Sequence, residues 1–163
     1  MKIKLIFAGL SVLLLLSACS KYEEGPFISL KSPEKRLLGL WEITELMVDT
    51  ANYISNYNDS ATYVKFSIIE YDDMFINVVK EARSGSQLST SLLTLEDGKK
   101  KMRFELKRFT AYQDMTQGIY ELIPPLEFDN EWTILRLKSD EFIITLTDNS
   151  INYRITFGKL EKY

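Results

Sequence analysis

The sequence predicts an all-β protein: a single antiparallel up-and-down barrel of about eight strands, with one short N-terminal helical turn. Two observations support this fold class. From residue 39 onward, apolar and polar residues alternate with a period of two in one segment after another, which is typical of strands buried on one face. Turn-forming Asp, Asn, Gly and Ser residues separate these segments at regular spacing, which is typical of an up-and-down barrel or a sandwich.

The N-terminal residues are expected to be a leader and not part of the fold. Lys2 and Lys4 precede an apolar stretch at 5–16, which is too short to span a bilayer and has the character of a secretory signal. We therefore expect 1–18 to be a cleaved signal peptide, 19–31 an anchor and polar tether, and 32–163 one folded domain. Loss of the two lysines leaves 18 basic residues against 23 acidic ones, a net charge of −5. This charge argues against nucleic acid as a partner.

The end of the leader resembles a sorting motif. Residues 16–19, Leu-Ser-Ala-Cys, are similar to the lipobox of bacterial lipoproteins. The resemblance implies that Cys19 is the lipid attachment site and that acyl chains such as palmitate hold the protein in the membrane. Ser20, in place of Asp, favours the outer membrane, and Glu23-Glu24 resembles signals that export lipoproteins to the cell surface. A location facing the periplasm stays open as the alternative.

The first elements of the domain follow from local signals. Ser32 is a good N-cap and Pro33 suits the first helical position, so a single helical turn is predicted before Gly39. The strand that follows is expected to have two faces, one with Trp41, Ile43 and Met47 and the other with Glu42, Thr44 and Leu46.

The same alternation predicts eight further strands: 63–71, 74–80, 88–95, 101–109, 118–123, 132–137, 142–147 and 151–160. Asp72-Asp73 is a tight turn, and Gly98 is expected to take the left-handed position of a hairpin loop. Pro124-Pro125 ends the strand at 118–123, because proline cannot join a central ladder.

A helical turn followed by Gly39-Leu40-Trp41 resembles the opening motif of lipocalins and the wider calycin group. The tail at 153–160 is also similar to that of small lipocalin-like lipoproteins. The resemblance implies that Trp41 closes one end of an eight-stranded barrel, and that Arg154 or Lys159 packs over its indole. The chain departs from the family in lacking a Thr-Asp-Tyr-like middle motif and a disulfide pair.

A barrel of this size is either filled by side chains or holds one small apolar ligand, and both alternatives stay open. The residues predicted to face inward are Trp41, Ile43, Phe66, Phe75, Phe104, Tyr120, Phe142, Tyr153 and Phe157. The candidate pocket residues among them are Trp41, Phe66, Phe104, Tyr120, Phe142 and Tyr153. The segment 52–60 is rich in Tyr, Asn and Ser, as adaptable binding loops are, so Tyr53 and Tyr57 are candidate contacts with an envelope protein or a glycan.

The composition excludes several chemistries. The chain has no histidine and one cysteine, which excludes histidine-based triads, histidine-based metal sites and cysteine clusters. We expect no catalytic residue, no metal and no cofactor, and therefore no enzyme. Lys101 and Arg103 should share the outer face of a strand, either as solvated charges or as contacts for anionic headgroups or an acidic glycan. Two functions stay open: a lipid-anchored ligand-binding barrel, and a packed barrel that acts as an interaction or inhibitor module.

Overall fold

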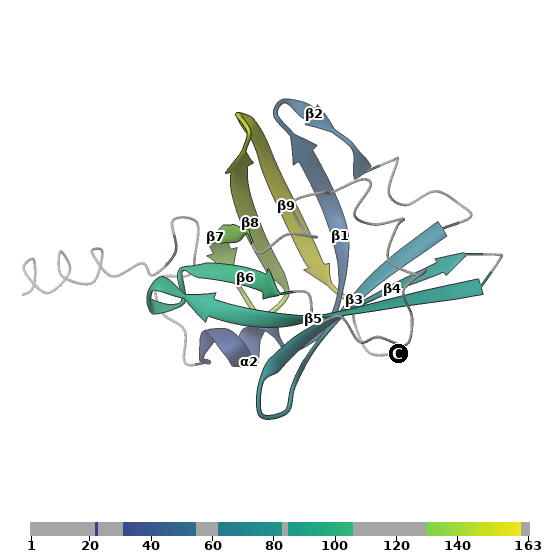
Figure 1. The fold of residues 1–163 in the computed structure, drawn as a ribbon, viewed down its shortest axis with the longest axis vertical. Coiled ribbons are helices and arrows are strands. Elements are labelled where there is room, and N and C mark those ends of the chain that lie inside the picture. The colour runs from purple at the N-terminus through teal and green to yellow at the C-terminus, as the bar shows by residue number, and fades with distance from the viewer. Residues whose placement is uncertain (1–21, 23–30, 55–61, 83–84, 106–129, 161–163) are drawn as a thin grey trace, which may run out of the picture.

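The computed structural model describes residues 22, 31–54, 62–82, 85–105 and 130–160 (Figure 1). One helical turn, α2 (Pro33–Leu37), precedes the strands. The strands of the first half are β1 (Gly39–Val48), β2 (Ala51–Asn52), β3 (Thr62–Glu70), β4 (Met74–Ala82) and β5 (Gly85–Glu96). A short 3-10 turn, η1 (Asp97–Lys99), leads to β6 (Lys101–Glu105), β7 (Glu131–Leu137), β8 (Glu141–Asp148) and β9 (Ile151–Lys159).

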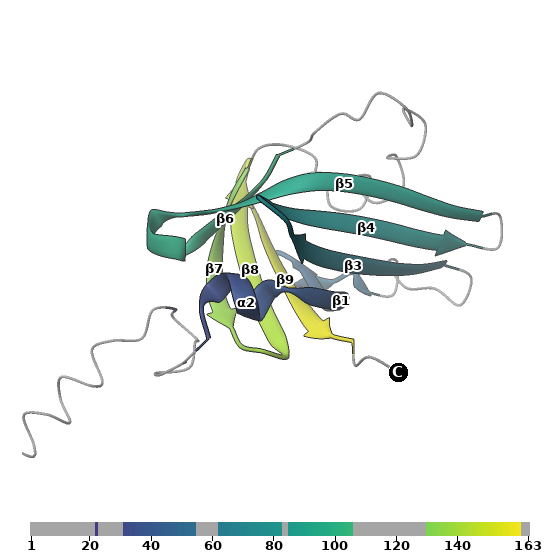
Figure 2. The same cartoon turned by 90° about the horizontal axis from the view of Figure 1, so that it is seen from below.

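The strands form a closed antiparallel barrel. Their order is β2-β1-β3-β4-β5-β6-β7-β8-β9, and β1 also pairs with β9, which closes the sheet on itself. Eight strands make the barrel, and the two-residue β2 pairs antiparallel with the last two residues of β1. Figures 1 and 2 show β3–β5 running across β7–β9, with α2 at one end. The predicted fold class is therefore confirmed.

The local signals act as predicted. Ser32 Oγ accepts a hydrogen bond from the backbone N–H of Lys35 at 3.4 Å, and Pro33 opens α2. Gly98 has a φ of +60°, the left-handed conformation expected for the β5–β6 turn. Asn149 and Ser150 have φ of +50° and +67° between the paired strands β8 and β9, as a type I′ hairpin requires.

The second half of β1 differs from the prediction. Leu46 is 0% exposed and lies in the core, whereas Met47 is only half-buried. The cause is a β-bulge: Ile43 pairs with Phe157 and Glu45 with Thr156, so Thr44 is an extra residue on β1. One extra residue moves every later side chain to the other face of the strand.

Phe75 was predicted to face inward, and this is wrong. The buried side chains of β4 are Met74, Ile76 and Val78, so Phe75 lies on the opposite face, across from Leu92 of β5. The segment carries apolar residues on both faces, and the alternation therefore did not decide its orientation. The pairing of Ile76 with the buried Ile68 of β3 shows which face of β4 is turned toward the core.

Several predictions fall outside the described residues. These are the anchor at Cys19, the contact residue Tyr57, the pocket residue Tyr120, and the strand at 118–123. Within the described ranges, no helix is long and apolar enough to cross a bilayer.

Candidate functional site

One end of the barrel, which we call the helix end, consists of α2 and the turns 97–100 and 138–140. Trp41 is fully buried there, and its Nε1 donates to the Leu37 carbonyl at 2.7 Å. Lys159 Nζ lies 4.9 Å from the centroid of the Trp41 ring and donates to the Leu38 carbonyl at 2.8 Å. Burial, with a contribution from nearby Lys31, lowers the pKa of Lys159. Of the two basic residues considered for this position over Trp41, Lys159 therefore occupies it.

Gly39 is required at the start of β1 because Lys159 packs close to its backbone. Its φ is +134°, a conformation that other residues rarely adopt. A Cβ at this position would also lie 2.7 Å from Cε of Lys159. The glycine of the Gly-x-Trp motif thus makes room for the cation that covers the tryptophan.

A second contact at the helix end joins the tether to the barrel. Tyr22 is 2% exposed, and its Oη donates to the Lys99 carbonyl at 3.0 Å. Cζ of Arg36 lies 5.7 Å from the centroid of the Tyr22 ring, and Arg36 Nη1 donates to the Leu137 carbonyl at 2.5 Å. Glu34 and Lys99 form an ion pair beside them. Burial raises the pKa of Tyr22 to about 12.

Sequence reasoning missed Tyr22. The residue lies in a polar segment without hydrophobic periodicity, and its hydrogen-bond partner is 77 residues away. No pattern in the sequence marks such a contact.

Aromatic rings fill the part of the interior next to the helix end. The Trp41 and Phe142 rings meet edge to face with centroids 4.8 Å apart, and Phe142 stacks on Phe157 at 4.2 Å. Phe66 meets Phe157 edge to face at 5.2 Å. Three of the candidate pocket residues, Trp41, Phe66 and Phe142, therefore belong to one packed cluster.

The two other candidate pocket residues that the structure describes, Phe104 and Tyr153, lie on different strands of the interior. Phe104 of β6 is buried opposite Leu93 of β5, and Tyr153 is buried on β9. Burial raises the pKa of Tyr153, and nearby Asp148 and Asp49 raise it further.

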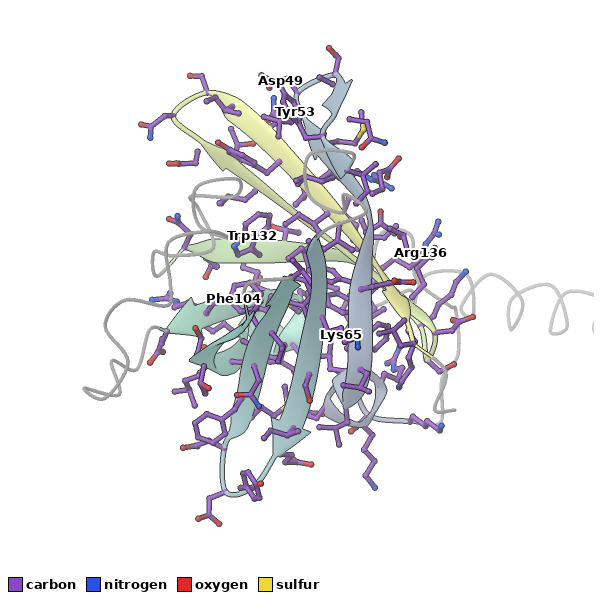
Figure 3. The ribbon with its side chains drawn as sticks, turned by 90° about the vertical axis from the view of Figure 1, so that its right-hand side faces the viewer. Asp49, Tyr53, Lys65, Phe104, Trp132 and Arg136 are labelled. Carbon is purple, nitrogen blue, oxygen red and sulfur yellow. The ribbon has the colours of Figure 1, made fainter. Side chains whose placement is uncertain are left out.

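Beside Phe104 lies a group that the sequence did not single out as a site. Trp132 of β7 pairs with Met102 of β6 and is 0% exposed (Figure 3). Its indole Nε1 has no hydrogen-bond acceptor in the part of the chain that the structure describes. The sequence marks Trp132 only as the start of a strand, because the lack of an acceptor depends on the packing.

The opposite end of the barrel, which we call the hairpin end, carries the turns 49–50 and 149–150. Asp49 Oδ1 accepts from the backbone N–H of Asn152 at 2.9 Å, which joins the two hairpins. Tyr53 lies at this end and is 41% exposed, as a contact residue should be (Figure 3).

The basic residues of β6 lie on its outer face, and each contacts a carboxylate. Lys101 Nζ is 2.5 Å from Glu131 Oε1, and Arg103 Nη2 is 3.1 Å from Glu96 Oε2. The two cations are therefore already paired within the protein. Among the described residues, no three acidic or thiol side chains gather into a candidate metal site.

No family model and no curated protein matches the chain. The closed barrel and the geometry of its interior and two ends are therefore the basis for a functional proposal.

Proposed function

We propose that the chain is a lipid-anchored binding protein of the bacterial outer membrane, with a lipocalin-like barrel that holds one small, largely apolar ligand bearing a hydrogen-bond acceptor. The observation that carries this proposal is the buried indole N–H of Trp132, which has no acceptor among the residues that the structure describes. Leaving a donor unsatisfied in a protein interior costs about 1–3 kcal/mol. A carbonyl, carboxylate or ether oxygen of a ligand would remove this cost, and the apolar side chains of Phe104, Leu93 and Met102 on the neighbouring strands suit the rest of such a molecule.

Two further features support the resemblance to lipocalins and the proposed lipid anchor. Gly39, Trp41 and Lys159 form the glycine–tryptophan–cation arrangement that the resemblance to lipocalins implies. The lipobox-like residues 16–19 supply the lipid attachment site at Cys19, and two or three acyl chains give a lasting anchor.

Binding is proposed in preference to catalysis because of where the charged groups lie. In the described residues, the buried cation Arg36 and the partly buried cation Lys159 are held by backbone carbonyls at the helix end. The ion pairs of β6 lie on the outer face. Groups that could act as acid and base do not converge on one point there.

The ligand is tested by native mass spectrometry of the protein extracted from its own cells. We expect a co-purifying small molecule with the natural chain and its loss from the Trp132→Phe variant, which keeps an aromatic ring but lacks the N–H. Tyr53→Ala, at the exposed hairpin end, is the matched control and should keep the molecule. Repeated preparations of the natural chain without any bound molecule would contradict the proposal.

The anchor is tested by growth with radiolabelled palmitate. The natural chain should incorporate the label and fractionate with the outer membrane, whereas Cys19→Ala should do neither. Label that persists in Cys19→Ala would refute acylation at this residue.

A second candidate function is a packed barrel that acts as an interaction or inhibitor module. The contact among the Trp41, Phe142, Phe157 and Phe66 rings favours it, because these side chains fill part of the interior. Its partner, an envelope protein or a glycan, would meet the hairpin end around Tyr53. A photo-crosslinker placed at residue 53 should then capture that partner, while the same group at Lys138 of the helix end should not.

A further inference from the structure

Tyr22 packs against the helix end of the barrel and lies only three residues after Cys19, the proposed lipid attachment site. Tyr22 is held at the helix end by its hydrogen bond to the Lys99 carbonyl and by the Arg36 guanidinium. Its ring is nearly inaccessible to solvent, so this part of the tether is packed onto the barrel.

The chain between the anchor and Tyr22 is short. Only Ser20 and Lys21 separate Cys19 from Tyr22. Three residue steps span at most about 11 Å, even when fully extended. The strands β8 and β9 have 8 and 9 residues and are therefore roughly 25–30 Å long. With the usual tilt of about 35–45° in a barrel, they give a wall about 20 Å high. The link is therefore too short for the barrel to stand with its hairpin end on the surface in which Cys19 would be anchored.

We propose that the mature protein lies with its helix end against the lipid headgroups and presents its hairpin end, with the turns 49–50 and 149–150 and Tyr53, away from the membrane. This inference rests on the proposed acylation of Cys19. The lysines exposed at and next to the helix end are Lys31, Lys35, Lys100 and Lys138, with Asp97 and Asp140 exposed among them. Because the charges are mixed, the short tether and not a net attraction sets the orientation.

The chain offers a direct way to measure this orientation. Acylation consumes the thiol of Cys19, the only cysteine, so an introduced cysteine is the single labelling site of the mature protein. A fluorophore is attached at Lys35→Cys on the helix end or at Asn149→Cys on the hairpin end, both exposed positions. The full, acylated protein is placed in phosphatidylethanolamine–phosphatidylglycerol vesicles that contain a lipid with a nitroxide quencher on its headgroup. We expect loss of emission at position 35 and none at position 149.

A second variant separates the tether from the barrel surface. An insertion of about 20 Gly and Ser residues between Lys21 and Tyr22 behaves as a flexible coil. It leaves the contacts of Tyr22 with the Lys99 carbonyl and the Arg36 guanidinium intact. With it, the loss of emission at position 35 should disappear. Equal quenching at both ends of the natural protein, stronger quenching at position 149, or no effect of the insertion would each overturn the inferred orientation.

The same preparation shows which proposal has failed. If the protein without an introduced cysteine takes up the thiol label and does not bind vesicles, Cys19 is not acylated, and both the anchor and the orientation are refuted. If that protein stays unlabelled and binds vesicles while the two ends are quenched alike, only the orientation is wrong.

Discussion

At the residue scale, the two tryptophans are buried to the same degree but differ in their hydrogen bonding. Trp41 Nε1 donates to the Leu37 carbonyl at 2.7 Å, and its ring lies under Lys159. Trp132 Nε1 has no acceptor in the described part of the chain. The same substitution at each position therefore removes similar volume and different polar interactions.

We expect Trp41→Phe to lower the free energy of unfolding by about 1–3 kcal/mol more than Trp132→Phe does in ligand-free protein. The first change leaves the Leu37 carbonyl without its buried donor and weakens the cation–π contact, whereas the second removes a donor that has no acceptor among the described residues. Urea unfolding of both variants, followed by circular dichroism, measures the difference. Equal losses of stability would mean that the hydrogen bond of Trp41 contributes nothing beyond its packing.

At the element scale, the sequence predicted the strands and turns better than it predicted which face each strand buries. The β8–β9 hairpin followed from Asp148-Asn149-Ser150, since short polar residues favour turns. The orientation of Leu46 did not follow, because a bulge at Thr44 depends on pairing with β9 and leaves no mark in the alternation. Phe75 was misplaced because both faces of its strand carry apolar residues.

The β8–β9 turn offers a test of the hairpin geometry. Ser150 has a φ of +67°, which glycine adopts without steric cost. We expect Ser150→Gly to raise the free energy of unfolding by up to about 1 kcal/mol. Ser139→Gly, in the β7–β8 turn where φ is not positive, should be neutral or destabilising. Chemical denaturation of the two variants decides this, and a gain at position 139 equal to that at 150 would contradict the geometric reason.

At the scale of the whole molecule, strand count and turn spacing predicted an antiparallel barrel or sandwich, and the resemblance of Gly39-Leu40-Trp41 to the lipocalin opening motif favoured the barrel. The docking of the tether was not predictable, because it joins Tyr22 to a carbonyl 77 residues away through one ring and one hydroxyl. Of the candidate pocket residues, Phe104 and Tyr153 are buried, as their predicted inward orientation requires, while Trp132 was identified only because its indole N–H has no acceptor among the described residues.

The docked tether predicts a specific loss of stability at alkaline pH. Burial raises the pKa of Tyr22 from 10.0 to about 12, so the folded protein keeps the phenol proton in a range where the unfolded chain releases it. This contribution to stability is complete below pH 10 and is lost as the pH rises toward about 12. The Tyr22→Phe variant lacks the titrating group, and its stability should therefore fall less than that of the natural chain over the same range.

The measurement is the free energy of unfolding of a chain that begins at Ser20, with and without Tyr22→Phe, between neutral pH and pH 12. Near neutral pH the variant should be less stable by about 1 kcal/mol, because it loses the hydrogen bond to the Lys99 carbonyl. The two curves should then converge as the pH rises, since only the natural chain carries a phenol that ionises more readily in the unfolded state than in the folded state. Parallel curves across this range would mean that Tyr22 is solvated in solution, and the short link between Cys19 and the helix end would then no longer support the proposed orientation of the barrel.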